Sequence, residues 1–217
     1  FLVVNTHRGL FRFNRMSNGL SNAPAIWQRF IEGVLSGIDG VECVMDDIII
    51  TAPTDEEHLK RLELVFARLN QNDIRLNPEK CEFFEESLTY CGFRLKHQEI
   101  HKCNDKLEAI RKAPALRNVC ELRSFLGMIQ FYASFAAGLA DLAAPLYSLL
   151  KSSVKFAWPD KMEKVFRRIK EELCSPTVLV PFDPEKPIIL ATDASPYGIS
   201  AVLSHRFPDN SERPIAF

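Results

Sequence analysis

Two adjacent aspartates, Asp46 and Asp47, stand between two short apolar runs at residues 41–44 and 48–50. Two β-rich runs joined by so short a link predict a tight hairpin, with both carboxylates at its tip. Adjacent carboxylates repel one another unless a cation or a donor neutralises them. A hard divalent metal held by carboxylates is the usual solution, and such metals serve phosphoryl transfer. From the dipeptide alone, a solvated turn is the simpler alternative, because Asp is common in turns.

Another aspartate, Asp193, follows a fully apolar run at residues 188–192. This run predicts a strand, and the turn residues 195–198 lead into a second, alternating strand at 198–204. Taken alone, Asp193 is best interpreted as a strand-end residue that caps a turn.

The elements that would position these aspartates alternate between strands and helices. Residues 1–20 predict a strand pair, and a helix capped by Ser21 or Asn22 is expected to follow and to end near residue 37. Thr54 and Glu57 form a capping box for a second helix that ends by residue 73. Further along the chain, the patterns predict short β segments at 81–84 and 88–95 and helices at 104–112, 118–131, about 139–151 and about 160–173. The four prolines within residues 176–187 indicate a boundary.

Charge is unevenly distributed along the chain. Residues 102–173 contain 13 Lys and Arg against 8 Asp and Glu, a net charge of +5, whereas residues 1–101 carry −4 and residues 174–217 carry −2. A basic segment can contact a phosphate backbone, although the solvated faces of helices explain so mild an excess equally well. If the segment grips a duplex, Lys102, Arg111 and Arg123 are the candidate contacts.

The composition excludes several classes of protein. With 47% hydrophobic residues and a net charge of −1, the chain is typical of globular proteins and is not disordered. No run of about 18 apolar residues predicts a membrane span, so no membrane partner is expected. The six cysteines are spread singly, which argues against a zinc site and favours reduced thiols. Because the chain begins Phe-Leu-Val-Val, without Met or a signal sequence, we expect it to be part of a longer polypeptide.

The order of the motifs resembles the palm of reverse transcriptases, most closely those of gypsy-type LTR retrotransposons. The matching segments are 11–16, 19–25, 44–47, 76–83 and 90–92, and residues 121–127 resemble the thumb helix that follows the palm. Residues 158–159, 190–198 and 201–204 resemble the opening of the tethered ribonuclease H domain.

The resemblance implies roles for particular residues. Asp46 and Asp47 match the metal-binding pair of the catalytic hairpin, and Asp193 matches the first metal-binding carboxylate of the ribonuclease H domain. Asn18, Gly19 and Lys80 match positions beside the incoming nucleotide, and Tyr90 and Gly92 match the primer grip. The implied cofactor is Mg²⁺ or Mn²⁺.

The implied fold is α+β and has three parts. They are a partial polymerase palm at 1–101, built of antiparallel sheet with helices, a helical thumb or connection at 102–155, and the first strands of a truncated ribonuclease H-like domain at 156–217. We expect about two strands of that last domain. The implied partners are an RNA template, a DNA primer or RNA–DNA hybrid, deoxynucleoside triphosphates and the rest of the Pol polyprotein. The expected location is intracellular: the cytoplasm, virus-like particles or the nucleus.

The expected activity is RNA-directed DNA synthesis by two-metal nucleotidyl transfer, with ribonuclease H. We predict that the isolated chain is inactive, because residues 1–20 contain no acid to serve as the family's first palm carboxylate and only one ribonuclease H carboxylate is present. The alternative is a catalytically inert, retroelement-derived protein that binds nucleic acid or another protein. Val44 and Asn18, which replace the Tyr and Phe usual in the family, favour this alternative, whereas the intact aspartates favour the enzyme.

Overall fold

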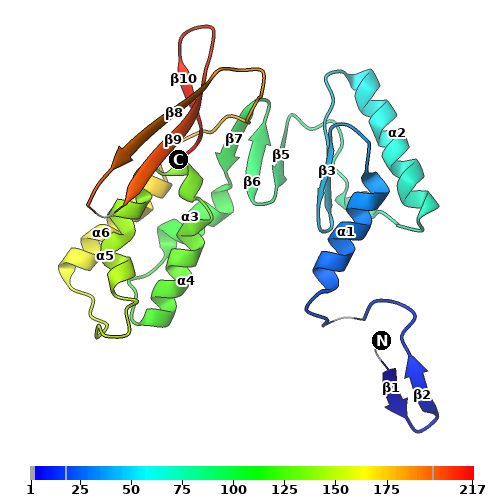
Figure 1. Cartoon of the computed structure of the whole chain (residues 1–217), viewed down its shortest axis with the longest axis horizontal. Helices are drawn as coiled ribbons and strands as arrows, with labels where there is room; N and C mark the ends of the chain where they lie inside the picture. The colour runs from blue at the N-terminus through cyan, green and yellow to red at the C-terminus, as the bar shows by residue number, and fades with distance from the viewer. Residues whose placement is uncertain (1–2, 18, 197) are drawn as a thin grey trace. The chain divides into compact units, whose positions relative to one another are not determined.

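A computed structural model of the chain describes residues 3–17, 19–196 and 198–217. The chain divides into two compact units, Phe1–Phe83 and Phe84–Phe217, which are described separately below (Figure 1). The three domain bounds expected from the sequence remain a prediction.

The first unit is formed by two hairpins and two helices. Its elements are β1 (Val3–Thr6), β2 (Gly9–Arg12), α1 (Ala23–Leu35), β3 (Val41–Val44), β4 (Asp47–Ile50), α2 (Asp55–Gln71) and the short 3₁₀ helix η1 (Pro78–Lys80). The strands β1 and β2 pair in antiparallel fashion, as do β3 and β4, so both predicted strand pairs are confirmed.

The caps of the two helices differ in how well the sequence predicted them. The Thr54 hydroxyl accepts a hydrogen bond from Glu57 N at 3.3 Å, which confirms the predicted cap of α2. Asn22 is the N-cap residue of α1, but its side chain makes no capping hydrogen bond. Both helices and the β3–β4 hairpin bury their apolar faces in one small core, whose buried members are Ile31, Val34, Leu35, Ile38, Cys43, Val65 and Leu69.

The strand expected at residues 81–84 is wrong. This segment follows η1 as irregular chain, and Phe83 packs edge-on against Phe66 of α2 with the ring centroids 6.3 Å apart. The aromatic residues that suggested a strand are therefore used to cover a helix.

The second unit begins with a three-stranded antiparallel meander and continues as a helical bundle. The strands are β5 (Ser87–Tyr90), β6 (Phe93–Lys96) and β7 (Glu99–Lys102), and β7 was not predicted. The helices are α3 (Asn104–Lys112), α4 (Val119–Gln130), η2 (Ala133–Phe135), α5 (Leu139–Ser148) and α6 (Asp160–Leu173). The four α-helices correspond to those predicted, within three residues at each end.

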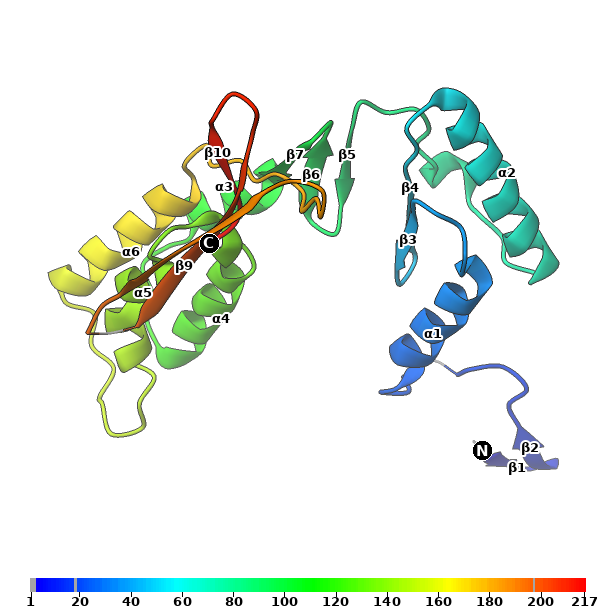
Figure 2. The same ribbon diagram turned by 45° about the horizontal axis from the view of Figure 1, so that its top comes forward.

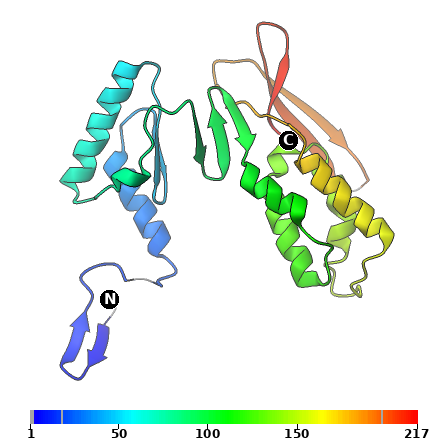
Figure 3. The ribbon, with the colours of Figure 1, turned by 180° about the vertical axis from the view of Figure 1, so that it is seen from behind.

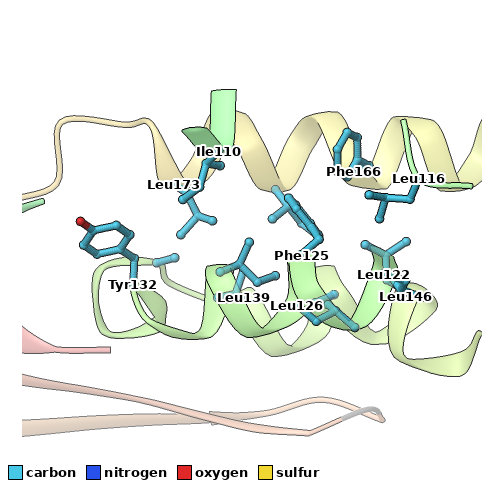
Figure 4. Close-up of a cluster of buried hydrophobic side chains, with 14 of the residues drawn as sticks. Ile110, Leu116, Leu122, Phe125, Leu126, Tyr132, Leu139, Leu146, Phe166 and Leu173 are labelled. Carbon is cyan, nitrogen blue, oxygen red and sulfur yellow. The ribbon is translucent and has the colours of Figure 1, made fainter. Parts of the chain in front are cut away.

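These helices enclose the larger of the two cores. In Figure 4, Phe166 of α6 lies opposite Phe125 and Leu122 of α4. The rings of Phe125 and Phe166 lie 4.6 Å apart. Because burial of one large apolar side chain contributes about 1.5–3 kcal/mol, this cluster stabilises the packing of the helices against one another.

A second sheet follows the helices. It contains β8 (Ile188–Ala194), β9 (Ile199–Arg206) and β10 (Glu212–Ala216) in the order β10-β9-β8, all antiparallel (Figures 2 and 3). The expectation of about two strands is thus wrong, since β10 adds a third. The C-terminal end of β10 is tied to the helical core, where Phe217 N donates to Ser134 O at 3.0 Å.

No helix among the described residues is both long and apolar enough to cross a membrane.

Candidate carboxylate sites

The β3–β4 hairpin places both aspartates at its tip. Val44 pairs with Asp47, so Met45 and Asp46 form a two-residue loop, and Asp47 is the first residue of β4. Both aspartates are exposed. Met45 has a φ of 56°, a left-handed conformation that a residue with a Cβ adopts only at some cost. The tip therefore needs support from outside the hairpin.

Helix α1 provides that support through two consecutive side chains. Gln28 accepts a hydrogen bond from Met45 N at 2.7 Å and donates one to Cys43 O at 2.9 Å. Trp27 donates from its indole Nε1 to Met45 O at 3.0 Å. Both backbone polar groups of Met45 are thus bonded to α1. This arrangement fixes the loop residue that directly precedes the aspartate pair.

Asp46 also lines a cavity of ≈ 630 Å³ in the first unit. The cavity is bounded by α1, the hairpin and residues 72–76, and it includes the side chains of Arg15 and Arg75. A guanidinium group suits carboxylate and phosphate oxygens. Because Asp73 also lines the cavity, its lining contains two carboxylates and two guanidinium groups.

The donor set at the hairpin is suited to a hard cation but is small. Two exposed carboxylates supply the oxygen ligands that Mg²⁺ prefers, usually together with water and substrate phosphates. No group of three or more His, Cys, Asp or Glu side chains suited to a metal occurs within the described part of the chain. By themselves, Asp46 and Asp47 therefore lack the further carboxylates that a two-metal centre needs to bridge its ions.

The residues assigned to nucleotide binding are placed to different degrees. Asn18 lies outside the described residues. Gly19 has a φ of +85°, a conformation that favours glycine, and its Cα faces open space. Lys80 ends η1 and is exposed, but it is not among the residues that line the cavity beside Asp46.

In the second unit, the segment assigned to the primer grip forms a tight turn. Tyr90 pairs with Phe93, which leaves Cys91 and Gly92 as a two-residue loop with φ values of 48° and 79°. Two successive positive φ values match the twist of a hairpin, and glycine is favoured at such positions. Phe93 stacks on Phe131 with the centroids 5.0 Å apart, which joins the turn to the end of α4.

Tyr132 fastens this turn to the helical core. Its hydroxyl donates to Gly92 O at 2.9 Å and accepts from Cys103 N at 3.1 Å. Burial raises the pKa of Tyr132, so the hydroxyl retains the proton that it donates. A Cβ on Gly92 would overlap the Nζ of Lys106 and lie 2.9 Å from Phe131 Cζ. Gly92 is thus required both for its φ and for its close contacts.

Asp193 lies near the end of β8, opposite Ser200 of β9. Its side chain is exposed, and Oδ1 accepts a hydrogen bond from Ala194 N at 2.9 Å. The turn that follows is held by Ser195, whose hydroxyl donates to Asp141 Oδ1 of α5 at 2.7 Å. Ser195 and Gly92 are thus hydrogen-bonded to different residues of the helical segment, Asp141 and Tyr132.

One of the three predicted phosphate contacts is wrong. Lys102 is only 6% exposed, and its ammonium donates to Ser175 O at 2.8 Å and lies 5.5 Å from the Phe135 ring centroid. Burial lowers the pKa of Lys102. Arg111 is exposed but is paired with Glu108 at 2.6 Å. Arg123 is exposed on α4 and makes no ion pair with a described residue, so it is the best placed of the three.

Sequence reasoning missed the residues that support the sites. Gln28 and Trp27 sit on a helix whose apolar pattern was evident, but nothing in that pattern shows that a glutamine bridges a hairpin 15–17 residues later. Asp141 likewise gave no signal, because its partner Ser195 is 54 residues away. Arg15 lies within a motif noted for its resemblance, yet only the structure shows that it lines the same cavity as Asp46.

Comparison with known families gives matches for both units. Residues 1–95 match the family model described as reverse transcriptase (RNA-dependent DNA polymerase). Residues 158–217 match the model of the RNase H-like domain found in reverse transcriptase.

Whole-chain relatives agree with these matches. The chain is 33% identical over 218 residues to the transposon Tf2-3 polyprotein of Schizosaccharomyces pombe, and 32% identical to the Tf2-7 polyprotein of the same organism. Each alignment covers 100% of this chain but only 16% of the relative, so the chain spans about one sixth of the length of these curated relatives.

Solved structures share the fold. A foamy viral protease-reverse transcriptase in complex with double-stranded DNA is 25% identical, with a TM-score of 0.82 over 93% of this chain and 36% of that one. A second foamy viral structure, in complex with an RNA/DNA hybrid, is 24% identical, with a TM-score of 0.81 over 99% of this chain and 29% of that one.

Proposed function

The chain belongs to the reverse transcriptase and RNase H region of LTR retrotransposon polyproteins, and we propose that it contributes the catalytic hairpin of an RNA-directed DNA polymerase. The observation that carries the proposal is the exposed Asp46–Asp47 pair on a hairpin tip whose backbone is bonded to α1. A solvated turn would need no such support. The hydrogen bonds between Met45 and α1 instead hold the two like-charged carboxylates in one geometry.

Asp46 and Asp47 would hold Mg²⁺ or Mn²⁺ together with carboxylates outside the described set. When bound, such ions neutralise the charge that develops on a transferring phosphoryl group. The chain's own task is to hold the two carboxylates in position, which Gln28 and Trp27 do through Met45. Gly19, Asn18 and Lys80 remain the proposed contacts of the deoxynucleoside triphosphate.

The second unit would supply the primer grip and the start of a ribonuclease H. Tyr90 and Gly92 stand on a turn that is fixed to the helical core, as a loop that steadies a primer end requires. Asp193 would be the first carboxylate of the ribonuclease H site. The described residues do not complete that site either, since no metal-suited group of three ligands includes Asp193.

The proposed nucleic-acid partners are an RNA template with a DNA primer, and an RNA–DNA hybrid. The foamy viral relatives support this proposal, since they were solved with double-stranded DNA and with an RNA/DNA hybrid. The remainder of a Pol polyprotein is the proposed source of the missing carboxylates.

Primer extension on an RNA template with Mg²⁺ tests the proposal. The chain within its natural polypeptide should extend a primer, and both D46N and D47N should abolish extension. D39N is the matched control, because Asp39 is an exposed loop aspartate in the same unit. Extension that survives D46N and D47N would refute the proposed role.

The isolated 217-residue chain should give no product in the same assay. Product from the chain alone that vanished in D46N would contradict that expectation. Nucleic-acid binding without extension, even in the natural polypeptide, would favour the inert binding protein instead.

A further inference from the structure

The turn that follows Asp193 is tied to a helix that is distant in the sequence. The Ser195 hydroxyl lies 2.7 Å from Asp141 Oδ1 and 3.3 Å from Gly198 O, and it has one proton to donate. The shorter contact, to a carboxylate, takes that proton because charge-assisted hydrogen bonds are the stronger ones. The same oxygen accepts from Gly198 N at 3.1 Å, so Ser195 joins the turn to α5.

Strand β8, which carries Asp193 near its C-terminal end, has a partner strand on one side only. In the sheet order β10-β9-β8, strand β8 is an edge strand, and Asp193 is its second-last residue. Among the described residues, the side-chain hydrogen bonds at Asp193 involve Ala194 N and the Ser200 hydroxyl, and both residues belong to the same hairpin. Edge residues near a strand end open readily unless something outside the ladder holds them.

Helix α5 is a suitable anchor. Leu139, Ala143 and Leu146 bury one face of α5 in the helical core, so Asp141 projects from a fixed element. Ser195 is the second residue after Asp193 and begins the turn that follows β8. The bond to Asp141 therefore acts two residues from Asp193 along the chain.

We propose that Asp141 is a positioning residue for Asp193: through Ser195, it holds the Asp193 end of β8 against α5. This inference rests on the proposed role of Asp193 as a metal-binding carboxylate. Asp141 itself binds no metal in this proposal. Its effect is to limit the conformations that the Asp193 carboxylate samples before a cation arrives.

The test measures Mn²⁺-induced broadening of amide NMR signals in the 217-residue chain. In the parent, the Ala194 amide should broaden on Mn²⁺ addition, and D193N should abolish that broadening. D141A and S195A should each raise the Mn²⁺ concentration for half-broadening at Ala194 by about five-fold, the scale of one lost hydrogen bond. The double variant should lose no more than either single one. The Asp47 amide should respond as in the parent.

Two further variants separate positioning from other effects. D105A is the matched control, because Asp105, like Asp141, is an acidic residue in the first turn of a helix. D141N retains an oxygen that can accept the Ser195 hydrogen bond, so it should restore most of the parent response. Broadening at Ala194 in D141A equal to that in D105A would overturn the proposal. So would a D141N response as weak as that of D141A, since charge alone would then explain the effect.

Failure of the metal role would be visible separately. If the Ala194 amide does not broaden in the parent, or broadens equally in D193N, Asp193 does not hold Mn²⁺ without the other carboxylates of its site, and this result does not bear on the tie to α5. Hydrogen exchange then decides the anchoring by itself. Faster exchange of the Ser195 and Gly198 amides in D141A than in D105A supports the tie to α5, and equal exchange overturns it.

Discussion

Replacing Gln28 by Met should loosen the tip of the β3–β4 hairpin while the rest of the first unit stays folded. Met is similar in length and is a good helix former, so α1 should persist. The change removes the acceptor for Met45 N and the donor to Cys43 O, which Gln28 holds at 2.7 and 2.9 Å. Met45 would then keep its φ of 56° with only the Trp27 bond for support.

The expected change in the free energy of opening the tip follows from the two lost hydrogen bonds. Each contributes about 1 kcal/mol net, and the positive φ of Met45 adds to the tendency to open. Opening of the tip should therefore become easier by about 1–2 kcal/mol, which corresponds to a roughly 5- to 30-fold change in the opening equilibrium.

Hydrogen exchange followed by NMR is the assay. The amides of Met45 and Asp47 should exchange about 5- to 30-fold faster in Q28M, whereas amides in the middle of α2 should not change. R29M is the matched control, because Arg29 is the next residue of α1 and is exposed. If Met45 exchanges in Q28M at the rate seen in R29M, the Gln28 bonds do not hold the tip and the reasoning is refuted.

Other variants test the second unit. G92A should lower the free energy of unfolding by about 1–3 kcal/mol, because a Cβ meets Phe131 and the φ is positive, whereas G127A, with no atom within 4 Å of its Cβ, should be neutral or stabilising; urea denaturation compares them. Hydrogen bonds from Trp158 and then Arg167 lower the pKa of Glu163, so its contribution to stability should be present above the ordinary pKa of about 4.3 and be lost as the pH falls through the lower folded value. Thermal melts of E163Q and the parent should therefore converge in acid, and a constant difference would contradict this. R123E should weaken binding to an RNA–DNA hybrid and reduce its salt dependence, measured by fluorescence anisotropy at several salt concentrations, and an unchanged salt slope would remove Arg123 from the interface.

Local signals in the sequence predicted most of the elements. Thr54 and Asn118 both cap helices at the expected positions, because a capping side chain and the amide it bonds are only three residues apart. The Asp46–Asp47 hairpin was evident for the same reason, since its two strands are adjacent in the chain. The strand expected at 81–84 failed where the information was not local: Phe83 pairs with Phe66, and sequence alternation cannot distinguish a ring that enters a sheet from one that covers a helix.

Lys102 shows that local sequence also fails to predict whether a charged side chain is exposed. Its type indicated a solvent-exposed cation in a basic segment, but its ammonium bonds to Ser175 O, a backbone group 73 residues away. A charge count therefore overestimates the cations that are available to a phosphate backbone. In the helical segment, residues such as Arg111 are also neutralised by acids on the same helix.

The two carboxylate sites are held by contacts to different parts of the chain, so we expect them to respond differently to mutation. The Asp46–Asp47 tip is supported from α1 by residues fewer than 20 positions away, so its geometry should form together with the local structure. The Asp193 end of β8 depends on Asp141, which belongs to a core assembled from four helices.

Mutations that loosen the helical core should therefore disturb Asp193 and leave the Asp46–Asp47 tip unchanged. The core substitution L146A tests this asymmetry: Leu146 is fully buried in α5, five residues after Asp141, and its truncation should speed exchange at Ser195 but not at Met45. Equal acceleration at both amides would show that the two sites are not secured independently.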